Sequence, residues 1–272
     1  MEHYRIHKES IPYISFPVLG DIDWICHGFS TRYGGVSTGI HSTMNLGFQN
    51  GDKTDAVYEN YNRICNAIGV LPESIVHAKQ THKDNVRVVT YDDIGKGYNR
   101  ERDYDDIDGL ITNQAGITLT ILTADCVPVY LVDPVNRAIG LAHSGWRGTI
   151  QRIASKTVNC MQQTFGSKPA DILAVTGPCI GVECYEVGDE VASCFATEFS
   201  LDIYSKITLV QNNRTHINLS ETIKYSLIET GVSAENILQC GLCTACNSEM
   251  LFSHRITQGK RGTMAAFLAI KP

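Results

Sequence analysis

Three stretches of the chain repeat hydrophobic residues at the spacing of one helix face. The clearest covers residues 54–68, where Thr54 could cap the start and Gly69 could end the helix. Its apolar face consists of Val57, Tyr61, Ile64, Cys65 and Ile68. A second helix is expected over 149–165, and a third starts at Ser220 and stops at Gly231. Each of the three helices would pack its apolar face against a hydrophobic core.

Shorter apolar or β-branched runs, several bounded by turn-forming residues, predict strands between these helices. The expected strands cover residues 86–89, 117–122, 127–132, 138–142, 172–175 and 264–270. Because strands outnumber helices and many connections are short, we expect mixed β-sheets with helices outside, an α/β fold. No segment has the composition of a linker, so residues 1–272 are expected to form a single domain. The pattern does not give the order of the strands.

The composition is globular, with 43% hydrophobic and 19% charged residues among 272. Lys and Arg total 23 against 29 Asp and Glu, a net charge of −6, and there is no basic block. Nucleic acid is therefore not an expected partner. Residues 1–7 lack a signal peptide's apolar core and no apolar run approaches ~18 residues, so we expect a cytoplasmic protein that does not enter membranes. The 10 cysteines are then expected as free thiols or metal ligands.

Unusual polar residues gather where the central strands end. Asp125 and Cys126 interrupt an apolar run, and the strand 138–142 leads into His143. The short turn between the two strands indicates that they pair, which would bring Cys126 close to His143. His82 lies just before the strand at 86–89.

One thiolate and two imidazoles form a suitable zinc set, and three protein ligands leave a fourth position open, as in catalytic zinc sites. From spacing alone the indication is weak, because the distances along the chain match no compact zinc motif. The alternative is a core thiol with two partly exposed histidines that form hydrogen bonds. Copper would also bind a thiolate and imidazoles, since intrinsic affinity favours it over zinc.

Two further segments could bind a substrate. Arg147 stands at the start of the second helix, where backbone N–H groups and a guanidinium favour phosphate or carboxylate; it could equally cap a turn. The glycine-rich loop 27–35, which contains Arg32, lacks the Gly-Lys-Ser/Thr ending of a phosphate loop. Asn45, taken alone, is more typical of a turn.

Cys240, Cys243 and Cys246 form the densest cysteine cluster in the sequence. Two overlapping C-x-x-C pairs could ligate a second metal, but no further cysteine pair or histidine follows at the spacing of a zinc knuckle. A structural role is therefore favoured. Cys179 and Cys184 could be structural as well.

Taken together, these residues resemble the laccase-domain, YfiH-like polyphenol oxidase family. The matching segments run from residue 27 to residue 255 and comprise HGFSTRYGGVSTG, MNLG, KQTHKDNV, DGLIT, TADCVPVYLVDP, IGLAHSGWRGT, GPCIGVECYEVG and LFSHR. The resemblance implies a layered sandwich of mixed β-sheets flanked by helices, related to bacterial toxin deamidases with a Cys–His pair. It also implies that His82, Cys126 and His143 bind zinc. Where the family pattern has Thr-Gly-Arg near the end, this chain has Arg261-Gly262-Thr263, so no role is assigned to an arginine there.

The implied activity is phosphorolysis of adenosine, inosine and S-methyl-5′-thioadenosine, together with deamination of adenosine. For deamination, we expect zinc to activate water and Asp125 to relay the proton beside Cys126. For phosphorolysis, we expect phosphate to dock near Arg147. Arg32 and Asn45 are assigned to substrate orientation. The expected partners are purine nucleosides and phosphate, with the chain a monomer or weak homo-oligomer.

Three alternatives stay open. The older family name implies copper-dependent phenol oxidation, although the chain has 9 histidines and no His-x-His pair. A hydrolase with Cys126 as nucleophile and His143 as base would suit the editing of cell-wall peptide precursors. A non-catalytic zinc module is the least favoured, because the ligand set leaves a position open.

Overall fold

The computed structural model describes residues 3–272, and within them two six-stranded sheets face each other. Sheet A has the order β1 (Arg5–His7), β2 (Tyr13–Ser15), β3 (Ile25–Ser30), β15 (Met264–Ile270), β7 (Thr118–Thr123), β4 (Ile75–His77). Sheet B has the order β14 (Ile237–Gln239), β10 (Leu173–Thr176), β8 (Val127–Asp133), β9 (Ala138–Ser144), β6 (Ile107–Thr112), β5 (Asn85–Val88). Antiparallel pairs dominate, but β4 runs parallel to β7, β5 to β6 and β14 to β10. The expectation of mixed sheets is confirmed.

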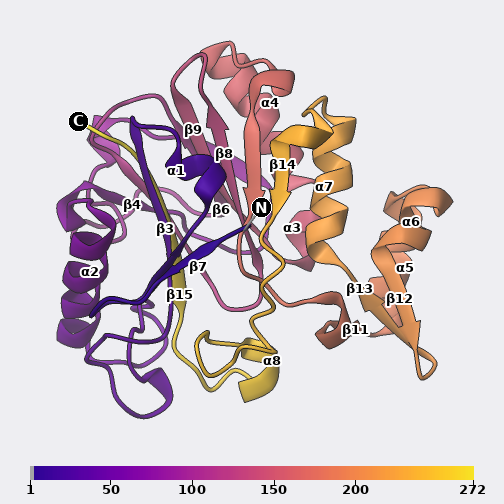
Figure 1. Cartoon of the computed structure of the whole chain (residues 1–272), viewed down its shortest axis with the longest axis horizontal. Coiled ribbons are helices and arrows are strands. Elements are labelled where there is room, and N and C mark those ends of the chain that lie inside the picture. The colour runs from indigo at the N-terminus through magenta and orange to yellow at the C-terminus, as the bar shows by residue number, and fades with distance from the viewer. Residues whose placement is uncertain (1–2) are drawn as a thin grey trace.

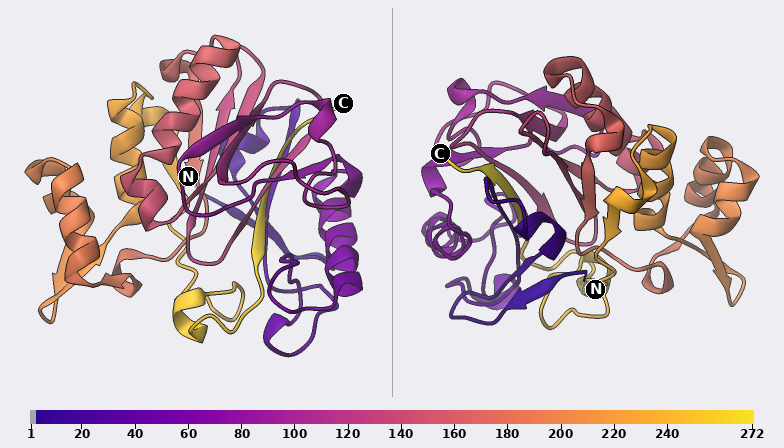
Figure 2. Two further views of the ribbon diagram at one scale, coloured as in Figure 1. Left: turned by 180° about the vertical axis from the view of Figure 1, so that it is seen from behind. Right: turned by 45° about the horizontal axis from the view of Figure 1, so that its top comes forward.

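Helices cover the outer faces of both sheets (Figure 1). The helices of the described residues are α1 (Pro17–Gly20), α2 (Thr54–Ile68), α3 (Trp146–Ile150), α4 (Ile153–Phe165), α5 (Asp189–Glu198), α6 (Leu201–Ile207), α7 (Leu219–Glu229) and α8 (His254–Thr257). Of these, α2, α4 and α7 lie on the outer faces of the sheets (Figure 1). The views in Figure 2 show α2 on one side of the sheets and α4 with α7 on the other. A small sheet, β11 (Glu186–Val187), β13 (Arg214–Ile217) and β12 (Thr208–Gln211), extends with α5 and α6 from one edge (Figure 1).

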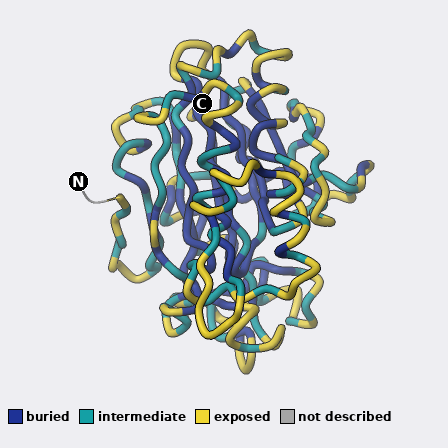
Figure 3. The backbone as a smooth tube through the Cα atoms, turned by 90° about the vertical axis from the view of Figure 1, so that its right-hand side faces the viewer, coloured by how far each residue is buried: buried dark blue, intermediate teal, exposed yellow. Residues whose placement is uncertain are grey.

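The layers follow from the alternation of side chains along the strands. In β15, Ala265 and Phe267 face the cluster under α2, whereas Ala266 and Leu268 face the core between the sheets. Figure 3 shows the buried residues concentrated along the central strands. Residues 3–272 therefore form an α/β sandwich of four layers, helix, sheet, sheet and helices, and we propose that they make up one domain. Met1 and Glu2, the first residues of the expected domain, lie outside the described range.

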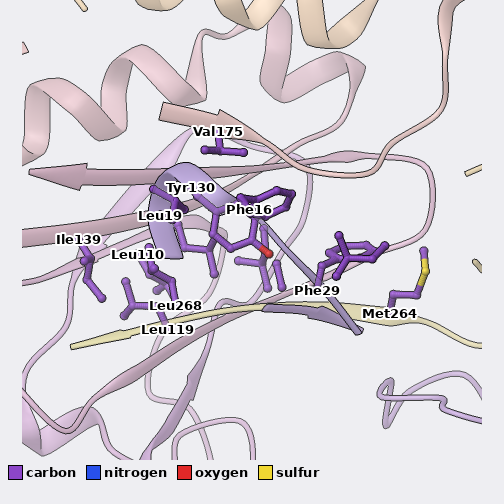
Figure 4. Close-up of a cluster of buried hydrophobic side chains, with 14 of the residues drawn as sticks. Phe16, Leu19, Phe29, Leu110, Leu119, Tyr130, Ile139, Val175, Met264 and Leu268 are labelled. Atoms are coloured by element: carbon purple, nitrogen blue, oxygen red, sulfur yellow. The ribbon is translucent and has the colours of Figure 1, made fainter. Parts of the chain in front are cut away.

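The core between the sheets contains large side chains from both (Figure 4). Phe16 packs edge-on against Tyr130, with ring centroids 5.1 Å apart. The Tyr130 hydroxyl donates a 2.9 Å hydrogen bond to the carbonyl of Gly28. This bond joins β8 of sheet B to β3 of sheet A, so the buried hydroxyl is satisfied where the sheets pack together.

The predicted helix over 54–68 is confirmed, and Gly69 ends it at φ 85°. The residue at its N-cap is Lys53, and Thr54 is already helical, so the expected cap is wrong. The single helix expected over 149–165 is also wrong. Arg152 has a left-handed backbone (φ 59°), which ends the helical hydrogen bonding and separates α3 from α4. The third expected helix is present as α7, which begins at Leu219, one residue before the expected start, and Asn218 caps it through its side chain.

Candidate metal centre

The chain crosses from sheet A to sheet B twice at the same end of the sandwich. The segment between β4 and β5 contains His82, and the turn between β7 and β8 contains Cys126. His143 lies near the end of β9 and pairs with Pro128, two residues beyond Cys126. The expected proximity of Cys126 and His143 is therefore confirmed, and it follows from the pairing of β8 with β9.

The possible ligand atoms of His82, Cys126 and His143 all lie within 4.8 Å of one another. The two imidazole rings have centroids 4.9 Å apart and are inclined edge to face. His143 is buried, Cys126 is half-buried and His82 is exposed, so the group is open on one side. This arrangement suits an ion bound by three protein ligands with one free position.

Asp108, which was given no role from the sequence, organises this group. Its Oδ1 lies 2.8 Å from Nδ1 of His143, and its carboxylate accepts hydrogen bonds from the backbone N–H groups of Thr81, His82 and Lys83. Since Nδ1 of His143 is engaged, Nε2 is left for a metal, the usual arrangement around zinc-bound histidines. The signals in the sequence were a carboxylate at the start of an apolar strand and its place in the matching segment DGLIT.

The glycine at position 145 fits the same interpretation. A Cβ atom there would lie 2.8 Å from Nδ1 of His82 and 3.0 Å from Sγ of Cys126. His82 itself has a positive φ of 61°, a strained conformation that the bonds to Asp108 hold in place. The donor set and the space kept open beside it therefore fit a bound metal.

The charges of these groups are strongly coupled. Burial alone would raise the pKa of Cys126, but the charge of His143 and hydrogen bonds from both histidines outweigh it and lower the pKa to about 6. Burial alone would lower the pKa of His143, but Cys126 and Asp108 raise it to about 9. Burial would likewise raise the pKa of Asp108, yet His143 and the backbone donors hold it below its usual value. Cys126 is therefore a thiolate near neutral pH, the form that binds metals.

A cavity of about 970 Å³ opens onto the three residues. Aromatic side chains line one part of it, namely Phe48, Tyr58 and Tyr98. They pack on each other with ring centroids 5.1 to 6.4 Å apart and are half-buried. Such a surface suits a flat ring system such as a purine.

Cationic and polar groups line another part of the cavity. His77 is buried and neither of its ring nitrogens has a hydrogen-bond partner, while the Nε atoms of Arg102 and Arg261 are also buried and unpartnered. Burial and the charge of Arg102 lower the pKa of His77 to about 3, so its ring is neutral at pH 7. Buried donors without partners are uncommon, and here they indicate a polar or anionic ligand. Arg261, to which the sequence gave no role, belongs to this group.

Asp125, Asn45 and Arg32, all expected site residues, bond to loops instead. Asp125 does not line the cavity. Its carboxylate accepts hydrogen bonds from Thr244 Oγ1 at 2.6 Å, Ser253 Oγ at 3.1 Å and the backbone of Arg255 at 2.7 Å. Its backbone turns at φ 85°, which sets the direction of Cys126. The placement assigns Asp125 to positioning, because three donors already occupy its oxygens.

Asn45 is fully buried, and its side chain bonds to Asp52 at 2.9 Å and to the backbone of Thr263 at 2.9 Å. Arg32 donates to the carbonyls of Ser42 and Ser248 and lies over the ring of Phe252. Neither side chain lines the cavity, so the structure does not bring them to a substrate.

Arg147 is exposed and lies with its guanidinium 4.2 Å from the ring centre of Trp146. It also lies outside the lining of the cavity. The helix it belongs to, α3, has only five residues. Arg147 is therefore not one of the residues that line the cavity, whereas Arg102 and Arg261 line it and each has a buried Nε atom without a partner.

No helix in residues 3–272 is long and apolar enough to span a bilayer. All ten cysteines lie in the described part of the chain as free thiols.

Residues 26–271 match the model of a protein family described as multi-copper polyphenol oxidoreductase laccase. A Bacillus subtilis relative named purine nucleoside phosphorylase YlmD is 36% identical over 249 residues, which are 90% of this chain and 88% of that protein. The crystal structure of a Bacillus licheniformis hypothetical protein, YfiH, has a TM-score of 0.91 at 32% identity and covers 98% of this chain and 99% of its own. YlmD from Geobacillus stearothermophilus has a TM-score of 0.89 at 30% identity, with 100% of both chains covered. The layered α/β sandwich is thus a fold shared with these structures.

Proposed function

The chain belongs to the family described as multi-copper polyphenol oxidoreductase laccase, and from that membership and its cavity we propose that it is a zinc-dependent purine nucleoside phosphorylase. Its substrates would be adenosine, inosine and S-methyl-5′-thioadenosine, and it would also deaminate adenosine. The observation that carries the proposal is that His82, Cys126 and His143 converge at a cavity with an aromatic and a cationic part. The Bacillus subtilis relative named as such an enzyme supports it.

The two parts of the cavity match the two halves of the reaction. In phosphorolysis an oxygen of phosphate bonds to C1′ of the ribose, the bond from C1′ to the purine nitrogen breaks, and the purine leaves with that electron pair and gains a proton. Phe48, Tyr58 and Tyr98 would hold the purine. Arg102 and Arg261 would hold the phosphate by charge, and neutral His77 can donate one hydrogen bond and accept another. These residues replace Arg147 in the proposal.

His82, Cys126 and His143 would hold the zinc ion, with Asp108 fixing the orientation of His143. A zinc ion with one open position supplies a Lewis acid and can lower the pKa of a bound water to about 7. Two carboxylates keep the ligands in position. Asp108 accepts from the backbone of His82 and contacts His143, and Asp125 holds the turn that contains Cys126. Within the cell we propose the cytoplasm, where ten free thiols would stay reduced.

Product analysis tests the activity. Purified protein is incubated with adenosine, inosine or S-methyl-5′-thioadenosine, with and without phosphate, and the products are separated by chromatography. Release of the free purine and the sugar phosphate only in the presence of phosphate is expected. Inosine formed from adenosine without phosphate would report deamination. Unchanged nucleosides with zinc-loaded protein, or turnover and zinc content unaffected by Cys126→Ala, would refute the proposal.

A second candidate is an amide hydrolase, which would suit the editing of cell-wall peptides. Asp108, His143 and Cys126 are arranged as an orienting carboxylate, a base and a nucleophile. This activity would persist after removal of zinc and be abolished by thiol alkylation, whereas the phosphorylase would be lost with the metal. A copper-dependent phenol oxidase is the third possibility, because two imidazoles and a thiolate also suit copper. Metal analysis of protein produced without added copper separates these cases.

A further inference from the structure

We propose that Cys184, Cys243 and Cys246 form a second metal site, which binds a thiophilic ion, zinc(II) in preference, through three thiolates. Their sulfur atoms all lie within 4.8 Å of one another, apart from the group around His82. Cys184 stands at the end of the short helical turn Val182–Cys184, and the other two come from the loop that follows β14. The inference is independent of the proposed function.

The distances favour an ion over a disulfide. Sγ of Cys184 lies 3.4 Å from Sγ of Cys246. A disulfide would need about 2.05 Å. Zn–S bonds of about 2.3 Å at tetrahedral angles place two sulfurs about 3.8 Å apart. The observed separation is nearer to the second value, and a third sulfur shares the site, which a disulfide would leave unused.

The backbone is arranged around Sγ of Cys243. That sulfur accepts hydrogen bonds from the backbone N–H of Gly181 at 3.1 Å and of Cys246 at 3.4 Å. A Cβ atom on Gly181 would lie 3.3 Å from the same sulfur, so glycine leaves it just enough room. N–H donors directed at a sulfur favour its thiolate form, which is the form that binds metals. Two segments 62 residues apart have thus been brought to one sulfur atom.

These three candidate ligands differ from the cysteine cluster that the sequence indicated. Cys240, the first cysteine of the overlapping C-x-x-C pairs, is buried in the core between the sheets and does not belong to the group. Cys184 takes its place and supplies the ligand that the local spacing lacked. The three cysteines are half-buried or exposed, with Cys246 exposed, so the fourth position of a tetrahedral ion would face solvent.

An ion at Cys184, Cys243 and Cys246 would stabilise a loop that leads to the wall of the cavity. The loop that contains Cys243 and Cys246 continues to Ser253 and Arg255, which bond to the carboxylate of Asp125 beside Cys126. Arg255 also donates to the carbonyl of Cys184 at 3.4 Å. An ion joining Cys184 to Cys243 and Cys246 would fix this loop, and with it the segment leading to Arg261 in the cavity wall.

The experiment counts metal ions. Protein expressed with zinc and without copper, and purified with a phosphine reductant, is analysed by mass spectrometry for metal content. We expect about two zinc ions per chain in the parent protein, about one in Cys126→Ala, and about one in Cys243→Ser. Cys194→Ser, a matched thiol outside both groups, should keep two. A zinc content in Cys243→Ser equal to that of the parent protein would overturn the proposal, whether the parent holds one ion or two.

Two further measurements remain decisive if Cys243→Ser fails to fold. In the parent protein, Cys184, Cys243 and Cys246 should resist alkylation until a chelator is added; alkylation at the same rate with and without chelator would refute the site. In Cys126→Ala refilled with cobalt(II), a thiolate-to-metal charge-transfer band should persist, and its absence would count against the site. A Cys184–Cys246 disulfide in protein kept under reductant would also contradict the proposal.

Discussion

Nδ1 of His143 lies 2.8 Å from Oδ1 of Asp108, and the same carboxylate accepts the backbone N–H of His82. One carboxylate thus holds two of the three expected zinc ligands, although Asp108 contacts no metal position itself. Partners of this kind orient metal-bound histidines, and their replacement commonly weakens metal binding.

Asp108→Asn should therefore weaken zinc binding by about 10- to 100-fold, because the amide keeps the size of the side chain but loses its charge. Competition with a chromogenic chelator measures the change. Asp106→Asn is the matched control, since Asp106 accepts bonds from Thr81 and Lys83 in the same loop but from neither histidine. Equal zinc affinities in Asp108→Asn and the parent protein would show that the carboxylate does not support the site.

Gly145→Ala should also weaken zinc binding, by at least about tenfold, which corresponds to ~1.4 kcal/mol. The added methyl group would lie within 3.0 Å of both His82 and Cys126 and would push the ligands apart. Gly188→Ala serves as control, because nothing lies within 4 Å of a Cβ atom there. Thermal unfolding of the zinc-free proteins shows whether the fold itself is preserved. Unaltered zinc affinity in Gly145→Ala would argue against an ion between these residues.

Arg102→Gln should raise the KM for phosphate by about 10- to 100-fold, the value of one hydrogen bond from a charged group. Deamination of adenosine, which uses no phosphate, should keep its rate. Steady-state kinetics with varied phosphate measures the effect. Arg147→Gln is the comparison, since the structure places Arg147 outside the cavity. If Arg147→Gln raised the KM and Arg102→Gln did not, the expectation from the sequence would be right and the phosphate site proposed from the cavity wrong.

His27 should make the fold sensitive to acid. Burial lowers the pKa of His27 to about 4, and its neutral Nε2 accepts the backbone N–H of Phe16 at 2.8 Å. Below about pH 6.5 the unfolded chain binds a proton at His27 that the folded chain does not bind. The contribution of His27 to stability should thus be complete above pH 6.5 and fall by about 3 kcal/mol as the pH drops toward 4.

Urea unfolding at several pH values measures this loss. His27→Gln should reduce the loss between pH 6.5 and 4 by about 3 kcal/mol, because glutamine can accept the same hydrogen bond without titrating. Buried His77, whose pKa is also lowered, would cause a further loss in both proteins. His3→Gln, at an exposed position, should leave the curve as it is in the parent protein. A decline of equal slope in His27→Gln would mean that other groups cause the acid sensitivity.

Local patterns in the sequence were sufficient for much of the fold. The helix at 54–68 was predictable because its apolar face repeats at the helical period and a glycine ends it. The neighbouring positions of Cys126 and His143 followed from two strands joined by a short turn. The break at Arg152 was not predictable, since the hydrophobic pattern does not show that a non-glycine residue adopts a left-handed backbone there.

The lining of the cavity could not be predicted, because it depends on long-range contacts that no local sequence pattern contains. Sequence reasoning could identify Asp125 and Asn45 as unusual, but not the direction in which each side chain points. Both point into loops whose hydrogen bonds they complete. His77, Arg102 and Arg261 were missed because their significance lies in buried side-chain nitrogen atoms without partners, which are visible only after the sheets have come together.

The segment between β4 and β5 is bound to both sheets, since Gln80 pairs with the backbone of Leu122 in sheet A and Asp108 in sheet B accepts from His82. The distance from His82 to His143 in sheet B therefore depends on how the two sheets pack against each other. A change of side-chain volume at Leu119 or Ile139, in the core between them, would alter metal affinity without touching the site. Among related proteins, conservation of that core would preserve metal binding as well as the stability of the fold.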